Sequence, residues 1–179
     1  SLSGGVTPID MDTDGDLDLF LTSAEGQQLV RNDGGETWTI GTAEAGLGSA
    51  PPDTVPIGAI AADFNNDDAP DLFVLRYGGS SLYRNDGNGR FTDVTDAANF
   101  PPYPYLPSSA AFTDIDHDGD VDIVIAGWAD LDATRDAVGD AGAVFPGEFV
   151  PAPLSLLRNN QDGTFTEITT DAQLESRGH

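Results

Sequence analysis

The sequence contains no cysteine and no lysine. The missing cysteine excludes disulfides, thiolate metal ligands and a cysteine nucleophile. With only seven basic residues, all arginine, against 31 acidic ones, the net charge is −24 at pH 7. No basic stripe exists on the chain, so nucleic acid and anionic membrane surfaces would repel it, and we expect neither as a partner.

Long apolar runs and a basic leader are also missing. No apolar run approaches the roughly 20 residues that a membrane span requires, and the opening SLSGGVTPID has neither a basic region nor a long apolar core. We therefore expect no membrane insertion, and a mature or excised segment, because no initiating Met is present. An apolar content of 39% with 21 Gly and 12 Pro in 179 residues is typical of a turn-rich globular domain.

One acidic stretch occurs three times along the chain. DMDTDGDLDL begins at Asp10, DFNNDDAPDL at Asp63 and DIDHDGDVDI at Asp114, so the starts are 53 and 51 residues apart. Internal similarity at such a period is typical of repeat architectures.

A second motif follows each acidic stretch and carries the pair Arg-Asn. Arg31 and Arg84 each lie 21 residues after the first aspartate of their repeat, whereas Arg158 lies 44 after Asp114, which places a 23-residue insertion in the third repeat. We expect each arginine to form an ion pair with a nearby aspartate. An aromatic residue follows each arginine at the seventh position and is expected in the core: Trp38, Phe91 and Phe165.

Each repeat is predicted to contain four short strands. Segments such as DLFVLRY and VDIVIAGW are rich in β-branched and aromatic residues, Asn-, Asp- and Gly-rich turns separate them, and no helical period is present. Four-stranded antiparallel units at about 50 residues predict an all-β fold, a β-propeller with three blades at 1–50, 51–102 and 103–179, the last with an insertion at about 127–153. A β-sandwich is the alternative, but it would not need identical units.

The acidic stretches are predicted to be calcium-binding loops. Carboxylates at every second residue repel one another unless a cation lies among them, and Ca²⁺ takes six to eight oxygen ligands. Gly15 and Gly119 provide the positive φ that a tight turn between ligands needs. The predicted ligands are the side chains of Asp10, Asp12, Asp14 and Asp18 with the carbonyl of Asp16; of Asp63, Asn65, Asp67 and Asp71 with the carbonyl of Ala69; and of Asp114, Asp116, Asp118 and Asp122 with the carbonyl of Asp120.

Up to three Ca²⁺ ions are expected, and the second loop is expected to bind most weakly. Asp68 stands where the other loops have glycine, and Asn65 removes one negative charge. An EF-hand is excluded, because strands flank the loops and the residue where an EF-hand has its last glutamate is Leu21, Val74 or Ile125. A solvated acidic turn without metal is the alternative for each loop.

In these motifs, DxDxDGDxDL followed by LxRNDGxGxF, the sequence resembles the FG-GAP or VCBS repeat family, which includes the propeller head of integrin alpha chains and many secreted bacterial proteins. The resemblance implies calcium held between the first and second strands of each blade. It also implies an extracytoplasmic setting, whether secreted, periplasmic or at the cell surface. Seven blades would be usual, so three predict either a piece of a longer polypeptide or a ring completed by another chain, since open blade faces would expose apolar surface.

Aromatic residues at the end opposite the acidic loops are the candidate partner-binding residues: Tyr103, Tyr105, Trp128, Phe145 and Phe149. Alternatively these side chains only cover that end of the propeller or pack against a neighbouring subunit. Catalysis is not expected, because no cysteine, no lysine and no non-terminal histidine except His117 is available. The favoured function is protein–protein interaction or assembly. The alternatives are a lectin-like, glycan-binding propeller and a non-catalytic piece of a larger secreted enzyme.

Overall fold

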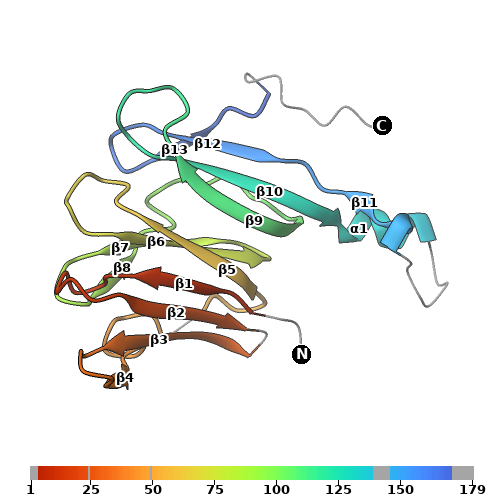
Figure 1. Ribbon diagram of the computed structural model, residues 1–179. Helices are drawn as coiled ribbons and strands as arrows, with labels where there is room; N and C mark the ends of the chain where they lie inside the picture. Colours follow the sequence, from red (N-terminus) through yellow and green to blue (C-terminus); the bar gives the residue numbers. More distant parts are fainter. Residues whose placement is uncertain (1–3, 24, 49, 139–145, 171–179) are drawn as a thin grey trace.

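In the computed structural model, which describes residues 4–23, 25–48, 50–138 and 146–170, three antiparallel sheets stack face to face (Figure 1). The sheets are blade 1, with β1 (Val6–Ile9), β2 (Asp18–Ser23), β3 (Gly26–Asn32) and β4 (Trp38–Ile40); blade 2, with β5 (Val55–Ala62), β6 (Asp71–Tyr77), β7 (Ser81–Asn85) and β8 (Phe91–Asp93); and blade 3, with β9 (Leu106–Thr113), β10 (Asp122–Asp130), β11 (Val150–Pro151), β12 (Ser155–Asn159) and β13 (Phe165–Glu167). The predicted all-β, partial propeller-like fold is confirmed.

Within each blade the strands follow one another in an up-and-down order. The short β11 pairs with the last two residues of β10, Ala129 and Asp130. Burial along the strands depends on how many faces are covered. In β2 buried and partly exposed residues alternate, whereas the first six residues of β6 are all buried. Blade 2 therefore lies between two sheets, and β6 is covered on both faces.

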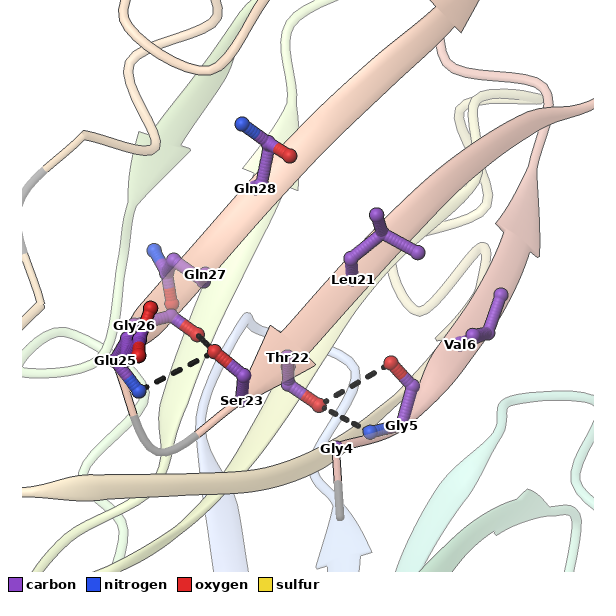
Figure 2. A pocket seen from close by; sticks show the side chains of 10 residues that line it. All are labelled: Gly4, Gly5, Val6, Leu21, Thr22, Ser23, Glu25, Gly26, Gln27 and Gln28. Carbon is purple, nitrogen blue, oxygen red and sulfur yellow. Dashed lines mark hydrogen bonds between the residues drawn. The ribbon is translucent and has the colours of Figure 1, made fainter. Parts of the chain in front are cut away.

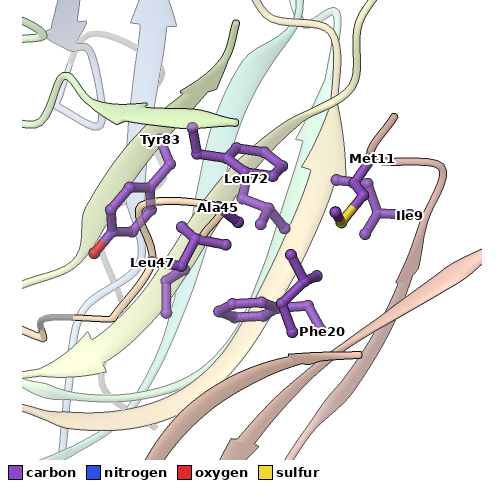
Figure 3. Packing of buried hydrophobic residues seen from close by; sticks show 10 residues of the cluster. Ile9, Met11, Phe20, Ala45, Leu47, Leu72 and Tyr83 are labelled. Carbon is purple, nitrogen blue, oxygen red and sulfur yellow. The ribbon is translucent and has the colours of Figure 1, made fainter. Parts of the chain in front are cut away.

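Two apolar clusters hold the blades together. The cluster between blades 1 and 2 (Figure 3) contains the buried residues Ile9, Met11, Phe20, Ala45, Leu47, Leu72 and Tyr83, among others. The cluster between blades 2 and 3 includes Phe73, Ile123 and Phe165. Burying one such phenylalanine contributes about 2 to 3 kcal/mol, so blade stacking supplies much of the stability of each sheet.

Hydrogen bonds with the same geometry recur at both blade junctions. In each case an asparagine amide donates to a carbonyl in the acidic loop of the preceding blade: Asn85 Nδ2 to Met11 O at 3.0 Å, and Asn159 Nδ2 to Phe64 O at 2.8 Å. A backbone bond accompanies each: Phe91 N to Ala45 O at 2.8 Å, and Phe165 N to Ala98 O at 2.9 Å. Blades 2 and 3 thus each donate hydrogen bonds to the blade before them, or to the link that follows it.

The insertion in the third repeat contains a helix that the sequence analysis did not predict. α1 (Leu131–Val138) begins after Asp130, whose Oδ1 accepts the N–H of Ala133 at 2.8 Å, and a 3₁₀ turn follows at Pro146–Glu148. Eight residues are too few to give a clear helical period. In Figure 1 the insertion lies at the opposite end of the blades from the acidic loops. No helix in the described ranges is long and apolar enough to cross a membrane.

The three aromatic residues expected in the core do not share one environment. Phe91 and Phe165 are 6% and 1% exposed, as expected, but Trp38 is 49% exposed. The expectation is wrong for Trp38 because it lies on the face of blade 1 that no other blade covers.

Candidate metal centres

Each acidic loop joins the first two strands of a blade, and its ninth residue fastens it to the rest of the blade. Asp18 accepts the N–H of Met11 at 2.9 Å and of Asn32 at 2.7 Å. The same pair of bonds, at 2.7 to 3.0 Å, recurs at Asp71 and at Asp122. The sequence analysis treated these aspartates only as ligands, but they also tie the loop to the Arg-Asn hairpin.

Burial distinguishes these ninth residues from the other acids of the loops. Asp18, Asp71 and Asp122 are at most 1% exposed. Burial raises the pKa of Asp18, and it raises the pKa of Asp71 to about 7, while the two N–H donors act in the opposite direction. At both sites the loss of solvent therefore raises the pKa more than the hydrogen bonds lower it.

Carboxylate oxygens converge in the first and third loops. One oxygen from each member lies within 4.8 Å of the others in two clusters: Asp10, Asp12 and Asp18, and Asp114, Asp116 and Asp118. Each cluster holds three of the four predicted side-chain ligands. The fourth in loop one, Asp14, accepts the N–H of Asp16 at 2.9 Å, and the fourth in loop three, Asp122, holds the two backbone donors already described.

Two oxygens in these clusters have no hydrogen-bond partner although they are buried: Asp12 Oδ1 and Asp114 Oδ1. A buried carboxylate oxygen without a donor is costly. Burial and then the neighbouring Asp14 raise the pKa of Asp12, and burial and then Asp118 raise the pKa of Asp116. Clustered carboxylate oxygens suit a hard cation such as Ca²⁺ and not a soft metal. The residues of both loops fit such an ion.

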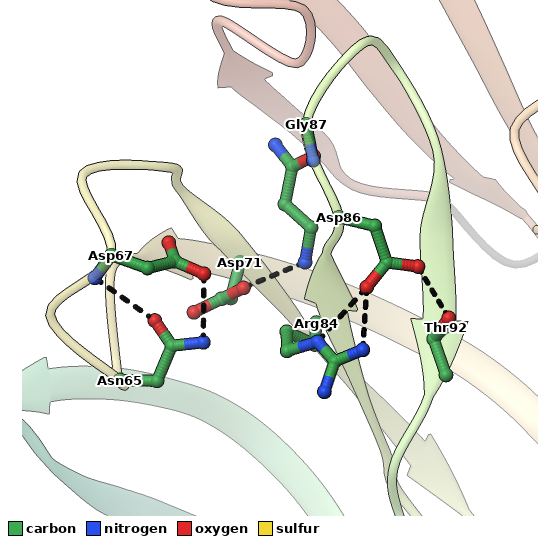
Figure 4. Close-up of polar contacts among 8 residues, drawn as sticks. Asn65, Asp67, Asp71, Arg84, Asp86, Gly87 and Thr92 are labelled. Carbon is green, nitrogen blue, oxygen red and sulfur yellow. Dashed lines mark hydrogen bonds and ion pairs between the residues drawn. The ribbon is translucent and has the colours of Figure 1, made fainter.

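The second loop is arranged differently. Within the part of the chain that the structure describes, Asp63, Asp67 and Asp71 do not form a cluster of this kind. Instead Asn65 Nδ2 donates to Asp67 Oδ2 at 3.0 Å (Figure 4), so an amide N–H points where the other loops place a carboxylate. Weakest binding at this loop remains a prediction.

The backbone of the loops has the turn geometry that the sequence predicts. Gly15 and Gly119 have φ of 95° and 97°, and Asp68 takes φ of 68° at the same position. The fourth residue of each loop is also left-handed, which no sequence pattern indicated: Thr13, Asn66 and His117, with φ from 59° to 62°. The carbonyl oxygens of Asp16, Ala69 and Asp120 stay predicted ligands.

The Arg-Asn hairpins confirm the expected ion pair in two repeats. Arg31 contacts Asp33 at 2.5 Å and Arg84 contacts Asp86 at 2.6 Å (Figure 4). Asn160 replaces this aspartate in the third repeat, and Arg158 forms no ion pair with any described residue, so the expectation is wrong there. These pairs are partly exposed and contribute little stability.

The repeated loop and hairpin sequence matches a known family. A family model described as FG-GAP-like repeat matches residues 10–74 and 63–125. The chain belongs to the FG-GAP-like repeat family. Both matches begin at the first aspartate of an acidic loop and end in the second strand of the next blade.

Two further comparisons concern whole proteins. No curated protein matches the FG-GAP chain significantly. Among solved structures it is similar to an Agrocybe aegerita lectin described for its specific recognition of non-reducing terminal N-acetylglucosamine, with 16% identity and a TM-score of 0.48. The match covers 92% of this chain and 37% of the lectin, so the chain spans little more than a third of that protein's length.

Four of the predicted partner-binding aromatics of the FG-GAP chain form two pairs of neighbouring rings. The rings of Tyr103 and Tyr105 lie 5.2 Å apart, and those of Trp128 and Phe149 lie 5.0 Å apart. The Tyr103 hydroxyl donates to Pro153 O at 2.5 Å, whereas Trp128 is 52% exposed. Phe145 lies outside the described residues. A partner-binding role for these aromatic residues stays a prediction.

A pocket of about 270 Å³ lies between FG-GAP blades 2 and 3, on the side of the β6–β7 turn and the link between the blades. Phe73, Phe100 and Tyr103 provide aromatic walls, and Ser80 and Asn99 provide polar groups. Of the predicted residues only Tyr103 lines it. The other lining residues escaped sequence analysis because they lie far apart in the chain, at 73–80, 95–102, 125 and 157.

Proposed function

We propose that this chain is a calcium-stabilised extracytoplasmic module that mediates protein–protein interaction or assembly and has no catalytic role. The observation that carries the proposal is the pair of aspartate clusters, in which Asp12 Oδ1 and Asp114 Oδ1 are buried without a donor. A divalent cation would neutralise the repulsion within each cluster and satisfy these oxygens.

In the first loop Asp10, Asp12 and Asp18 would hold the ion. Since Asp18 also accepts N–H donors from the loop and the hairpin, it connects the ion to two strands of the sheet. Calcium would therefore stiffen the end of the blade, and a rigid set of blades can present loops and open faces to a partner. Extracellular calcium is abundant enough to fill sites of modest affinity, which supports the extracytoplasmic assignment.

Calorimetric titration of the chelator-treated chain with Ca²⁺ tests the proposal. We expect at least two sites, and loss of one site with Asp12→Asn and of another with Asp116→Asn. Asp33→Asn is the matched control, because Asp33 lies in a hairpin and forms an ion pair with Arg31. No binding heat, or an equal effect of the control, would contradict the proposal.

Glycan binding is the second candidate function, favoured by the pocket between blades 2 and 3. Aromatic walls with a few polar groups suit a sugar ring, whose apolar face stacks while its hydroxyls form hydrogen bonds. Its exposed Asp96 and Asn99 side chains offer an acceptor and an amide beside Phe100 and Tyr103.

A glycan array with calcium present, including terminal N-acetylglucosamine, tests the second candidate. Asn99→Gly should abolish binding without unfolding the chain, because this side chain is exposed and glycine tolerates the φ of 57° at this position. Trp128→Ala is the control, since Trp128 is exposed and lies outside the pocket. Loss of binding with Trp128→Ala alone would assign the sugar to the insertion instead.

A further inference from the structure

A buried arginine lies between blades 1 and 2, at the end of β6 that is remote from the acidic loop. Arg76 has no exposed surface and forms no ion pair with any described residue. Burial lowers its pKa, while the neighbouring Tyr83 and then Asp93 act in the opposite direction. A buried cation without a counterion is costly. The charge of Arg76 therefore needs compensation that no ion pair in the described chain supplies.

The guanidinium contacts neutral groups from both blades. Its Nη2 donates to Gln27 Oε1, its Nη1 donates to Val74 O at 3.5 Å, and its Cζ lies 5.9 Å from the centre of the Tyr83 ring. Amide and main-chain carbonyl oxygens accept hydrogen bonds but carry no net charge. These contacts orient the guanidinium without neutralising it.

Three buried polar atoms at this place have no hydrogen-bond partner among the described residues: Arg76 Nε, Ser81 Oγ and Tyr83 Oη. Val74 and Tyr83 belong to the cluster between blades 1 and 2. Side chains two residues apart on a strand share a face, so Arg76 and Ser81 also face blade 1. Ser81 pairs with Val74, whose carbonyl contacts the guanidinium. The three free atoms therefore belong to one buried site.

The arginine is particular to blade 2. It lies five residues after the ninth residue of the acidic loop, where blade 1 has Ser23 and blade 3 has Gly127. A Cβ at Gly127 would collide with the Tyr103 hydroxyl, so blade 3 has no room for a side chain there. The buried charge is thus a feature of one blade junction and not of the repeat.

The free hydroxyl of Ser81 also has a specific cause. Its equivalent in blade 3, Ser155, donates to Glu167 Oε1 at 3.2 Å. Blade 2 has the shorter Asp93 in place of Glu167. Asp93 Oδ1 instead accepts the N–H of Thr95 at 3.0 Å and its hydroxyl at 2.6 Å. The Ser81 hydroxyl is therefore available to a ligand beside the guanidinium.

Gln27 separates this guanidinium from solvent. It is partly exposed and, with Ser23 and Gly26, lines a cavity of about 520 Å³ (Figure 2). Its side chain accepts from Arg76 Nη2 and donates to Leu47 O at 2.7 Å. A ligand bound beside Arg76 can therefore exchange with solvent when this one side chain moves.

We propose that Arg76, Ser81 and Tyr83 form a binding site for a small monovalent anion, such as chloride, between blades 1 and 2. All three free atoms can donate, since the guanidinium provides an N–H and each hydroxyl an O–H. An anion accepts these bonds and compensates the charge, whereas an ordered water molecule leaves the charge uncompensated. The inference goes beyond the proposed function, because it assigns an anion to the end of the blades opposite the calcium loops.

Urea denaturation at saturating calcium and constant ionic strength, with isethionate replaced stepwise by chloride, tests the proposal. A ligand of the folded state alone lowers the unfolding equilibrium constant by 1 + [L]/Kd, which is about elevenfold at ten times Kd. We expect this dependence in the wild type and its loss with Arg76→Met, a variant that fills the site with an apolar side chain. Arg84→Met is the matched control and should keep the dependence, because Arg84 is an exposed arginine of the same blade, paired with Asp86.

Ser81→Ala removes one donor and leaves the charge in place. It should weaken chloride binding about fivefold, as expected for the loss of one hydrogen bond. In crystals soaked in bromide, anomalous scattering should place the ion beside Arg76 Nε.

Equal unfolding curves in chloride and isethionate, or no bromide beside Arg76, would overturn the proposal, since ordered water would then fill the site. So would an equal loss of chloride dependence with Arg84→Met. A chloride dependence that occurs only with Asp93→Asn would also overturn it, because Asp93 would then be the counterion of Arg76. Calcium is saturating in every arm, so these outcomes are distinguishable from failure of the calcium proposal.

Discussion

The side-chain amides of Asn85 and Asn32 occupy equivalent positions in blades 2 and 1. Blade 1 packs against the face that carries Asn85, whereas no described blade packs against the face that carries Asn32. Asn85 is 1% exposed, and its Nδ2 donates to Met11 O at 3.0 Å and to Pro70 O at 3.1 Å. Its Oδ1 accepts the N–H of Gly87 at 3.0 Å. Replacement of Asn85 by alanine removes all three bonds and leaves their partners unsatisfied.

The expected loss follows from these bonds. A buried polar group left without a partner costs about 1 to 3 kcal/mol, so Asn85→Ala should lower the free energy of unfolding by about 3 kcal/mol. Asn32 keeps one amide bond, at 3.4 Å, and accepts the N–H of Gly34 at 3.1 Å in a more exposed setting. Asn32→Ala should therefore cost only about 1 kcal/mol.

Urea denaturation at saturating calcium, followed by circular dichroism and by tryptophan fluorescence, measures both variants. In thermal unfolding, a difference of about 2 kcal/mol should separate the melting temperatures of the two variants by about 4 to 8 °C for a chain of this size. If Asn32→Ala destabilises as much as Asn85→Ala, the bond across the blade junction is not the source of stability, and the reasoning fails.

Three further predictions concern other parts of the fold. Burial raises the pKa of Tyr103 to about 12, so the folded state keeps a proton that the unfolded chain loses near pH 10. The free energy of unfolding should therefore fall as the pH rises above about 10. Phenolate absorbance of the wild type, compared with that of Tyr103→Phe, checks this. Asn65→Asp should raise the calcium affinity of the second loop about fivefold by adding a charged ligand, measured by calorimetry, and an unchanged affinity would show that Asn65 does not limit binding. Phe20→Ala, at a site with no exposed surface, should cost about 3 to 5 kcal/mol in urea denaturation, and a loss below 1 kcal/mol would contradict the packing of blades 1 and 2.

Local features of the repeats could be predicted because they depend on residues close together in the chain. Gly15 and Gly119 do take positive φ, and Arg31 and Arg84 do pair with aspartates two residues away. The helix at 131–138 was missed because it is held by Asp130 and by packing inside the insertion rather than by a long apolar period.

Features that join distant segments could not be predicted. The second role of Asp18, the pocket between blades 2 and 3, and the exposure of Trp38 each depend on what another strand or blade places nearby. Trp38 has the same local sequence context as Phe91 and Phe165, yet only those two are covered.

Sequence alone determined the repeat, its strand pattern and the alternating aspartates of the acidic loops, because a two-residue strand period and a tight acidic turn are properties of a few neighbouring residues. Tertiary structure decided which carboxylates meet, which oxygens lose their hydrogen bonds and which blade face stays open. Those outcomes depend on burial, and burial is a property of the packed sheets rather than of any one of them.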